Sequence, residues 1–270
     1  MAYEKITDQN LIAEEFIVAS SFLKREVNIY AYLPTNITNP EALPLLLIND
    51  GQDLPKMPFE NILGSLLENN LISPVLCVGI DCGPDRKMEY GTANEKDYKG
   101  RGAKAALYTQ FIFEELLPFI KAKYFIPSFA EKSFAGFSLG ALSALDIAYN
   151  HPQQFSKVGM FSGSFWWRNK SYKEGYDDNV NRIMHNQIRN GNYYPWLKFF
   201  FECGRLDEKK DRNNNGIIDS IDDTLDLIKE LNLKGYTDKD IHYLELEDGT
   251  HDVPTWAKAF PEFLKWGWGK

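Results

Sequence analysis

The chain has 270 residues, of which 44% are hydrophobic and 14% aromatic, and its formal net charge at pH 7 is -8. This composition can fill a sizeable core, which excludes a disordered chain, and the acidic balance argues against nucleic acid or an anionic membrane as a partner. No apolar run approaches the roughly 20 residues that a membrane-spanning helix needs. Because the first residues have neither a basic start nor an apolar core, we expect no secretory signal. Three cysteines are too few for a disulfide framework. We therefore expect a cytoplasmic protein.

Strand-like segments begin near the N-terminus and recur along the whole chain. The first two have alternating hydrophobic and polar residues and predict an antiparallel hairpin. Later segments are short continuous apolar runs, which predict strands buried on both faces, as in a parallel sheet. The expected strands lie at 14–22, 25–33, 45–48, 74–80, 132–137, 157–161, 197–201 and 241–246.

Segments with helical periodicity separate most of these strands. They lie at 59–67, 107–121, 139–149, 179–189, 225–233 and 253–266. The alternation predicts one α/β domain over residues 1–270, with a mostly parallel central sheet, an antiparallel N-terminal hairpin and helices on both faces. We expect a lid or insertion around 168–196, an Asx-rich loop at 207–223 and a long polar loop at 83–103.

One short motif suggests chemistry. The sequence GFSLG at 136–140 fits G-x-S-x-G, the nucleophile elbow of α/β-hydrolases, and lies between a predicted strand and a predicted helix. Glycines on both sides allow a sharp turn and close approach of neighbouring elements. The turn would expose Ser138 at a helix N-terminus, where partial positive charge favours a developing anion. Ser138 is therefore the candidate nucleophile.

A serine nucleophile needs a neighbouring base, and histidine suits that task near neutral pH. The chain has four histidines. His151 at a helix end, His185 in a polar helix and His242 in a strand have more ordinary structural or surface roles. His251 follows the last predicted strand, at the sheet edge where the loops of α/β proteins form sites. His251 is thus the candidate base.

The third member must be a carboxylate that orients the imidazole. Asp207 is the first choice and Glu208 the second, because both follow the strand at 197–201. The order Ser138, acidic residue, His251 is the order found in α/β-hydrolases.

An oxyanion hole needs two backbone N–H donors. The amide of Leu139, directly after the nucleophile, is one candidate. The amide of Gln52 in the DGQD loop, which follows the strand at 45–48, is the other. An ordinary tight turn is the alternative interpretation of DGQD.

Several longer segments carry a family resemblance, among them LLLINDGQDL, VGIDCGPDRKMEY, AGFSLGALSAL and DGTHDVPTW. Together they resemble the esterase branch of the α/β-hydrolases that includes enterochelin-type trilactone esterases, feruloyl esterases, formylglutathione hydrolase and mycolyltransferases. The resemblance covers most of the chain. It implies Ser138 as nucleophile, Asp207 as acid, His251 as base, and Gln52 and Leu139 as oxyanion donors.

The function that follows is a serine hydrolase that cleaves small-molecule carboxylic esters through an acyl-enzyme, without a cofactor for catalysis. A trilactone siderophore ester is the leading substrate class by resemblance alone. An acyltransferase that uses the same acyl-enzyme is the alternative, and a non-catalytic binding protein of the same fold is the second. The sequence leaves open whether the chain is a monomer or a homo-oligomer.

The stretch DRNNNGIIDSID at 211–222 also fits a calcium-binding loop, with oxygen-bearing residues at alternate places and glycine at the sixth. The alternative is an Asx-rich turn that caps the next helix. The candidate calcium ligands are Asp211, Asn213, Asn215, Ile217, Asp219 and Asp222.

Substrate contacts are expected from side chains at the same sheet edge. Trp166 and Trp167 follow the strand at 157–161 and could form an aromatic wall. Arg86 could bind a charged substrate group, although an ion pair of Arg86 with Glu89 or Asp81 is an equally good interpretation.

Overall fold

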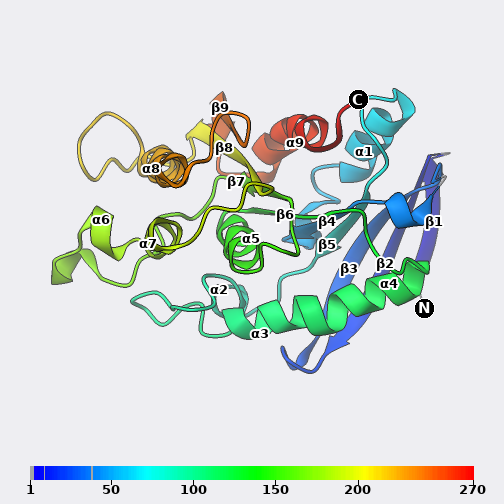
Figure 1. Cartoon of the computed structure of the whole chain (residues 1–270), viewed down its shortest axis with the longest axis horizontal. Helices are drawn as coiled ribbons and strands as arrows, with labels where there is room; N and C mark the ends of the chain where they lie inside the picture. The colour runs from blue at the N-terminus through cyan, green and yellow to red at the C-terminus, as the bar shows by residue number, and fades with distance from the viewer. Residues whose placement is uncertain (1–2, 9, 38) are drawn as a thin grey trace.

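The computed structural model describes residues 3–8, 10–37 and 39–270. In this part of the chain one central sheet separates two layers of helices (Figure 1). Its nine strands lie in the order β1-β2-β3-β5-β4-β6-β7-β8-β9. The strands are β1 (Tyr3–Asp8), β2 (Leu11–Ser20), β3 (Arg25–Pro34), β4 (Leu45–Asn49), β5 (Leu76–Ile80), β6 (Lys132–Phe137), β7 (Lys157–Phe161), β8 (Lys198–Leu206) and β9 (Ile241–Thr250).

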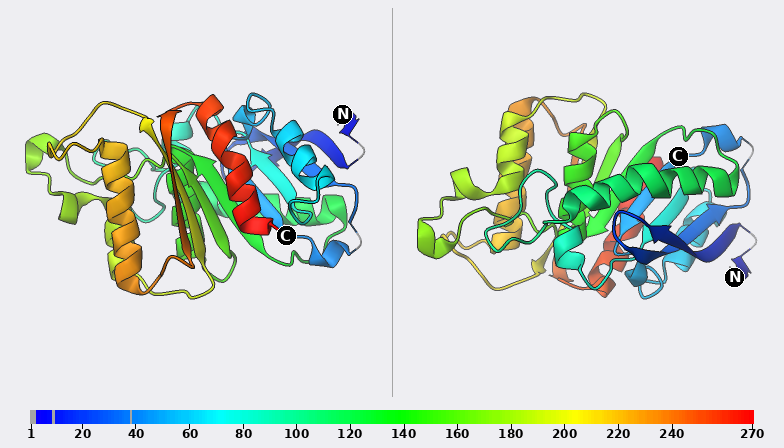
Figure 2. Two further views of the ribbon diagram at one scale, coloured as in Figure 1. Left: turned by 90° about the horizontal axis from the view of Figure 1, so that it is seen from above. Right: turned by 90° about the horizontal axis from the view of Figure 1, so that it is seen from below.

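The helices cover the sheet unequally. One apolar core joins the sheet to α3, α4, α5, α7 and α8, and a second joins its other face to α1 and α9 (Figure 2). The α-helices are α1 (Phe59–Glu68), α2 (Arg86–Glu89), α3 (Ala105–Gln110), α4 (Leu117–Tyr124), α5 (Leu139–Asn150), α6 (Asp178–Asn181), α7 (Ile183–Asn190), α8 (Asp219–Lys234) and α9 (Val253–Trp268). Shorter helical turns are η1 (Pro40–Ala42), η2 (Gly51–Asp53), η3 (Phe111–Leu116) and η4 (Tyr172–Glu174).

The predicted fold class is confirmed. Strands β4 to β9 pair in parallel, and β4, β5 and most of β6 to β8 are buried, as continuous apolar runs require. Strands β2 and β3 form the antiparallel hairpin. β1 extends this hairpin and was not expected from the sequence, because YEKITD has no sustained alternation. Parallel pairing brings the carboxyl ends of β4 to β9 to one edge of the sheet.

Two predicted helices differ in the structure. The helix expected at 107–121 runs from Ala105 to Tyr124 with a π-helical turn at its centre. Pro118 lies just after this turn, and a proline ring clashes with the regular carbonyl four residues earlier, which a wider turn relieves. The helix expected at 179–189 is broken into α6 and α7 at Arg182, whose backbone is extended.

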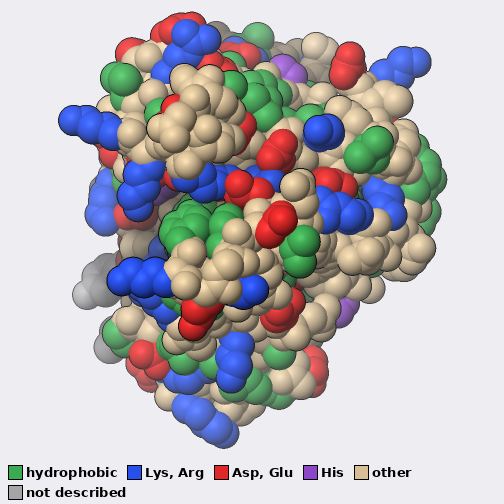
Figure 3. Space-filling view, turned by 90° about the vertical axis from the view of Figure 1, so that its left-hand side faces the viewer, with side chains coloured by type: hydrophobic (Ala, Val, Ile, Leu, Met, Phe, Trp, Pro, Cys, Tyr) green, Lys and Arg blue, Asp and Glu red, His purple; other side chains and the backbone are tan. Residues whose placement is uncertain are grey.

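The break at Arg182 belongs to a buried ion cluster. The guanidinium of Arg182 binds Asp223 of α8 at 2.6 Å, and the guanidinium of Arg212 binds the other oxygen of Asp223 at 3.1 Å. The side chain of Asp223 is fully buried. The cluster joins the segment 168–196 to α8, at the end of the molecule where acidic and basic side chains surround small hydrophobic patches (Figure 3).

Replacing Asp223 with alanine should lower the free energy of unfolding by about 3–5 kcal/mol, because the buried guanidinium of Arg182 and the partly buried guanidinium of Arg212 lose their shared partner. Urea denaturation followed by circular dichroism measures the change. The matched control is Asp226→Ala, which removes a carboxylate 2.6 Å from Arg182 that is 41% exposed. The control should cost less than about 1 kcal/mol. Equal losses in the two variants would show that burial of Asp223 does not govern the cluster.

None of the helices formed by the described residues is long and apolar enough to cross a membrane.

Candidate active site

Ser138 occupies a sharp turn between β6 and α5. Its backbone has φ 54° and ψ -117°, a conformation that L-residues rarely adopt and that costs about 1–3 kcal/mol. The surroundings hold this turn in place: the amide of Ser138 donates to the carbonyl of Phe161 at 2.8 Å, and the amide of Ser164 donates to the carbonyl of Ser138 at 3.1 Å. The strand, turn and helix predicted around GFSLG are all present.

Both motif glycines are required by close packing. A Cβ on Gly136 would lie 2.5 Å from the carbonyl carbon of Gly140, and a Cβ on Gly140 would lie 2.5 Å from Oδ2 of Asp50. Any larger side chain would push the turn away from α5 or from the loop after β4. The glycines therefore bring Ser138 next to that loop.

The hydroxyl of Ser138 lies beside a second serine. Its Oγ is 3.3 Å from Oγ of Ser164, whose residue is only 4% exposed. Ser164 was not among the residues predicted for the site. The available signal was its place in SGS directly after β7, at the same sheet edge as the end of β6.

Asp207 and His251 lie at the ends of the neighbouring strands β8 and β9. Nδ1 of His251 is 3.9 Å from Oδ2 of Asp207, which is ion-pair range but beyond a hydrogen bond. The side chain of Asp207 is fully buried, whereas that of His251 is 39% exposed. Within the described residues His251 makes no hydrogen bond to Ser138. Such bonds are often long without substrate and shorten in the reacting complex.

The start of α9 restrains His251. Asp252 accepts a hydrogen bond from the amide of Thr255 at 3.0 Å and so caps the helix. The ring of Trp256 meets the imidazole of His251 edge-on, with 5.5 Å between ring centroids. The loop between β9 and α9 thus has a defined conformation around His251.

The loop after β4 begins with Asp50 in the left-handed region, at φ 61°. The guanidinium of Arg86 binds both oxygens of Asp50, each at 2.7 Å, and also donates to the carbonyl of Phe137 at 3.3 Å. Arg86 therefore ties this loop to the strand that carries Ser138. Its partner is Asp50 rather than the predicted Asp81 or Glu89, and Glu89 instead binds Arg25 at 2.7 Å.

Several backbone amides near this junction lack a protein acceptor among the described residues, and two of them are the predicted oxyanion donors. They belong to Leu139, at the start of α5, and to Gln52, in η2. The side chain of Gln52 is held separately, because its Oε1 accepts from the amide of Cys82 at 3.1 Å. The DGQD loop forms a tight turn, and this turn leaves the amide of Gln52 unpaired.

Comparison of the chain with known protein families identifies the family to which it belongs. The family model described as "Putative esterase" matches residues 20–266. The chain belongs to the putative esterase family. Family membership supports hydrolysis of carboxylic esters.

Several relatives of this esterase show how far the similarity extends. "Uncharacterized protein YbbA" of Bacillus subtilis is 23% identical over 88% of the chain and 91% of its own length. The "Iron(III) enterobactin esterase" of Escherichia coli K12 is 30% identical over 57% of this chain and 36% of its own length. An enterobactin esterase structure from Shigella flexneri, determined with enterobactin, superposes with a TM-score of 0.72 at 22% identity over 97% of this chain and 59% of that one. The chain therefore spans less than two thirds of the length of the named enterobactin esterases.

The aromatic residues after β7 divide between core and surface. Trp167 is fully buried and packs against Gly91 and Gly102. Its side chain therefore cannot contact a substrate directly, and the predicted aromatic wall does not include it. Trp166 is partly exposed. The guanidinium of Arg101 lies 5.1 Å from the ring centroid of Trp166 and 5.0 Å from that of Trp167.

Hydrogen bonds between its own residues stabilise the Asx-rich loop at 211–222. The carboxylate of Asp211 accepts from the amides of Asn215 and Gly216, at 3.1 Å and 2.9 Å. Asp219 accepts from the amide of Arg212 at 2.8 Å and also lies 3.4 Å from its guanidinium. This arrangement matches the Asx-rich turn, and a guanidinium beside a would-be ligand opposes a cation. Calcium binding by the six predicted ligands stays a prediction from the sequence.

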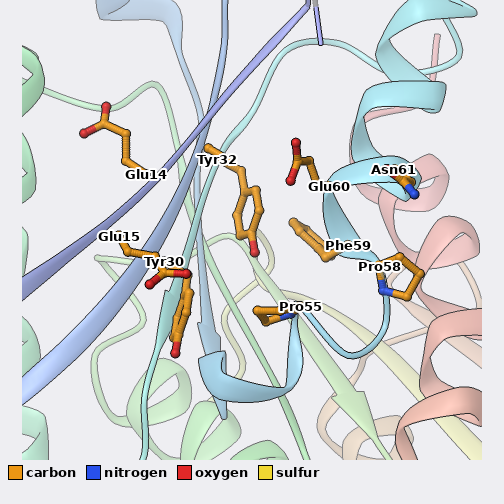
Figure 4. Close-up of a pocket in the computed structure, with 10 residues that line it drawn as sticks. Glu14, Glu15, Tyr30, Tyr32, Pro55, Pro58, Phe59, Glu60 and Asn61 are labelled. Atoms are coloured by element: carbon orange, nitrogen blue, oxygen red, sulfur yellow. The ribbon is translucent and has the colours of Figure 1, made fainter. Parts of the chain in front are cut away.

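A pocket of about 460 Å³ lies between the hairpin β2–β3 and the start of α1 (Figure 4). None of its lining residues belongs to the predicted site. They are Ala13, Glu14, Glu15, Tyr30, Tyr32, Pro55, Pro58, Phe59, Glu60 and Asn61.

Proposed function

We propose that this esterase cleaves carboxylic esters through an acyl-enzyme on Ser138. The observation that carries the proposal is the strained turn that presents Ser138 at the N-terminus of α5. A backbone strain of this kind is retained when surrounding contacts enforce it, and it is common at functional sites. The helix N-terminus adds partial positive charge where the tetrahedral oxyanion develops.

His251 and Asp207 complete the proposed triad. Because Nδ1 of His251 is the nitrogen near Asp207, Nε2 is left to accept the proton of Ser138. The serine oxygen then attacks the ester carbonyl, and the leaving alcohol takes the proton from Nε2 as the acyl-enzyme forms. Water attacks the acyl-enzyme in the second half, gives its proton to Nε2, and Ser138 regains its own proton as the acid leaves.

The unpaired amides of Gln52 and Leu139 are the proposed oxyanion donors. Arg86 supports them indirectly, because its double contact with Asp50 fixes the loop that carries Gln52. We assign Arg86 to positioning of the loop in place of the predicted contact with a charged substrate group.

The proposed substrates are trilactone siderophore-type esters or other small and aromatic esters. The similarity to iron(III) enterobactin esterases supports this class. The partly exposed ring of Trp166, with the guanidinium of Arg101 over it, offers one aromatic surface two residues after Ser164.

A panel of esters tests the proposal. Purified protein is given p-nitrophenyl acetate and butyrate, a feruloyl ester and a cyclic trilactone, with and without an added alcohol, and products are identified by mass spectrometry. Carboxylic acid as the main product supports hydrolysis. Transfer to the alcohol as the main product would replace hydrolysis by acyl transfer. No turnover of any ester would contradict the proposal and favour a binding protein with this fold.

A further inference from the structure

Two buried carboxyl groups share one face of β8. Glu202 lies within this strand and is 1% exposed. A Cβ on Gly204 would lie 2.8 Å from Oδ1 of Asp207, so the carboxylate of Asp207 rests against the side-chain position of Gly204. Residues two apart in a strand point to the same face. The side chain of Glu202 therefore projects from the face against which Asp207 is packed.

These carboxyl groups lack the partners that buried oxygens require. Within the described residues, Oε1 of Glu202 and both carboxylate oxygens of Asp207 are buried without a hydrogen-bond partner. Two buried carboxylates that share one face of a strand cannot both carry a charge at low cost, and sharing a proton would satisfy both. Burial, with a further contribution from the charge of Asp207, raises the pKa of Glu202 to about 8.

The other oxygen of Glu202 is connected to His251 through Ser162 and Trp256. Oε2 is 3.5 Å from Oγ of Ser162, and the amide of Ser162 donates to the carbonyl of Glu202 at 2.8 Å. Nε1 of Trp256 donates to Oγ of Ser162 at 3.1 Å, which leaves the serine hydroxyl free to donate to Glu202. Trp256 is also the ring that meets His251. With Oε2 accepting from Ser162, Oε1 is the oxygen of a neutral Glu202 that can donate.

We propose that Glu202 is a positioning residue whose neutral carboxyl group donates its Oε1–H to Asp207. One oxygen of Asp207 is then fixed by Glu202, and the other faces Nδ1 of His251. The proton stays on Glu202 throughout the reaction. This inference rests on the proposed triad.

The groups around Glu202 define how this contact responds to pH. Asp207 is packed against the same face of β8, and His251 follows the neighbouring strand β9. Cys203 and Tyr243 lie nearby, and burial raises the pKa of both, so they stay neutral as Glu202 titrates. Above a pH of about 8, ionisation of Glu202 removes the hydrogen bond and sets a second negative charge beside Asp207.

Two variants separate positioning from simple packing. Glu202→Gln keeps the shape and donates an N–H at every pH, whereas Glu202→Leu fills the space without a donor. On a p-nitrophenyl ester at pH 7 we expect Glu202→Gln to keep kcat within about 3-fold of the unmodified protein. Glu202→Leu should lower kcat by about 10- to 100-fold with KM little changed, the scale on which a displacement of about 1 Å affects catalysis.

The pH dependence of kcat distinguishes a positioning role from a purely structural one, because loss of packing alone would not change it. The kcat of the unmodified protein should fall above a pH of about 8, and Glu202→Gln should remove this fall. Unchanged kcat in Glu202→Leu, or the same fall in Glu202→Gln, would overturn the proposal.

A spectroscopic titration keeps this test separate from the test of the esterase itself. In 15N NMR, the ring nitrogens of His251 should show an inflection near pH 8 in the unmodified protein that is absent in Glu202→Gln. This measurement needs no turnover, so it holds even if no ester is cleaved. Identical His251 titrations in the two proteins would overturn the role of Glu202 while leaving Ser138 as nucleophile.

Discussion

Replacing Ser138 with alanine should lower kcat for ester hydrolysis by about 10⁶-fold, close to the effect of removing the nucleophile from other serine hydrolases. The acyl-enzyme cannot form without the serine oxygen, so what remains is the smaller contribution of the oxyanion donors and of substrate binding. Alanine is smaller than serine and β-unbranched, so the strained turn loses little besides the hydroxyl. Initial rates on the best p-nitrophenyl ester, at saturating substrate, measure the change.

The neighbouring serine makes this a stringent test. Oγ of Ser164 lies 3.3 Å from Oγ of Ser138, close enough for this hydroxyl to be an alternative nucleophile. If the Ser138→Ala protein keeps activity within about 10-fold, the nucleophile is wrongly assigned. Ser65→Ala, at an exposed position of α1, is the control for the substitution itself and should leave kcat unchanged.

Replacing Asp207 with asparagine should lower kcat by about 10⁴-fold with little change in overall structure. The carboxamide preserves shape, but it removes the charge that holds His251 in the orientation and tautomer needed to accept the serine proton. The side chain of Asp207 is fully buried and its Oδ2 lies 3.9 Å from Nδ1 of His251. Within the described residues no other carboxylate lies within ion-pair distance of His251. Steady-state kinetics and circular dichroism together measure the effect.

Glu208→Gln is the matched control, because Glu208 is the adjacent acid and the second candidate from the sequence. It is partly buried, and burial raises its pKa, but the ion pair with His251 is made by Asp207. The control should keep kcat within about 3-fold. A large loss of kcat in Glu208→Gln with a small loss in Asp207→Asn would show that Glu208, and not Asp207, is the acid of the triad.

The fold was predictable because its signals are local. Continuous apolar runs mark strands buried on both faces, and GFSLG marks the turn between β6 and α5. The break between α6 and α7 has no comparable signal. It occurs at Arg182, whose partner Asp223 lies 41 residues away, so only the folded chain brings the two together.

In the candidate site, too, local sequence signals were predictable and contacts between distant segments were not. The places of Ser138, Asp207 and His251 at one sheet edge were predictable, because each comes directly after a strand of the parallel part of the sheet. The pairing of Arg86 with Asp50 and the burial of Trp167 depend on contacts between distant segments. Glu202 had a local signal, since it is the one acid within the apolar run of β8, but its relation to Asp207 needed the structure.

Labelling with a fluorophosphonate probe, followed by peptide mapping, tests the central claim most directly. The probe reacts with an activated serine and requires neither a known substrate nor turnover. We expect one label per chain on the peptide that contains Ser138, and none in the Ser138→Ala protein. A folded protein that stays unlabelled, or a label on Ser164 or any other serine, would contradict the assignment of Ser138 as the nucleophile.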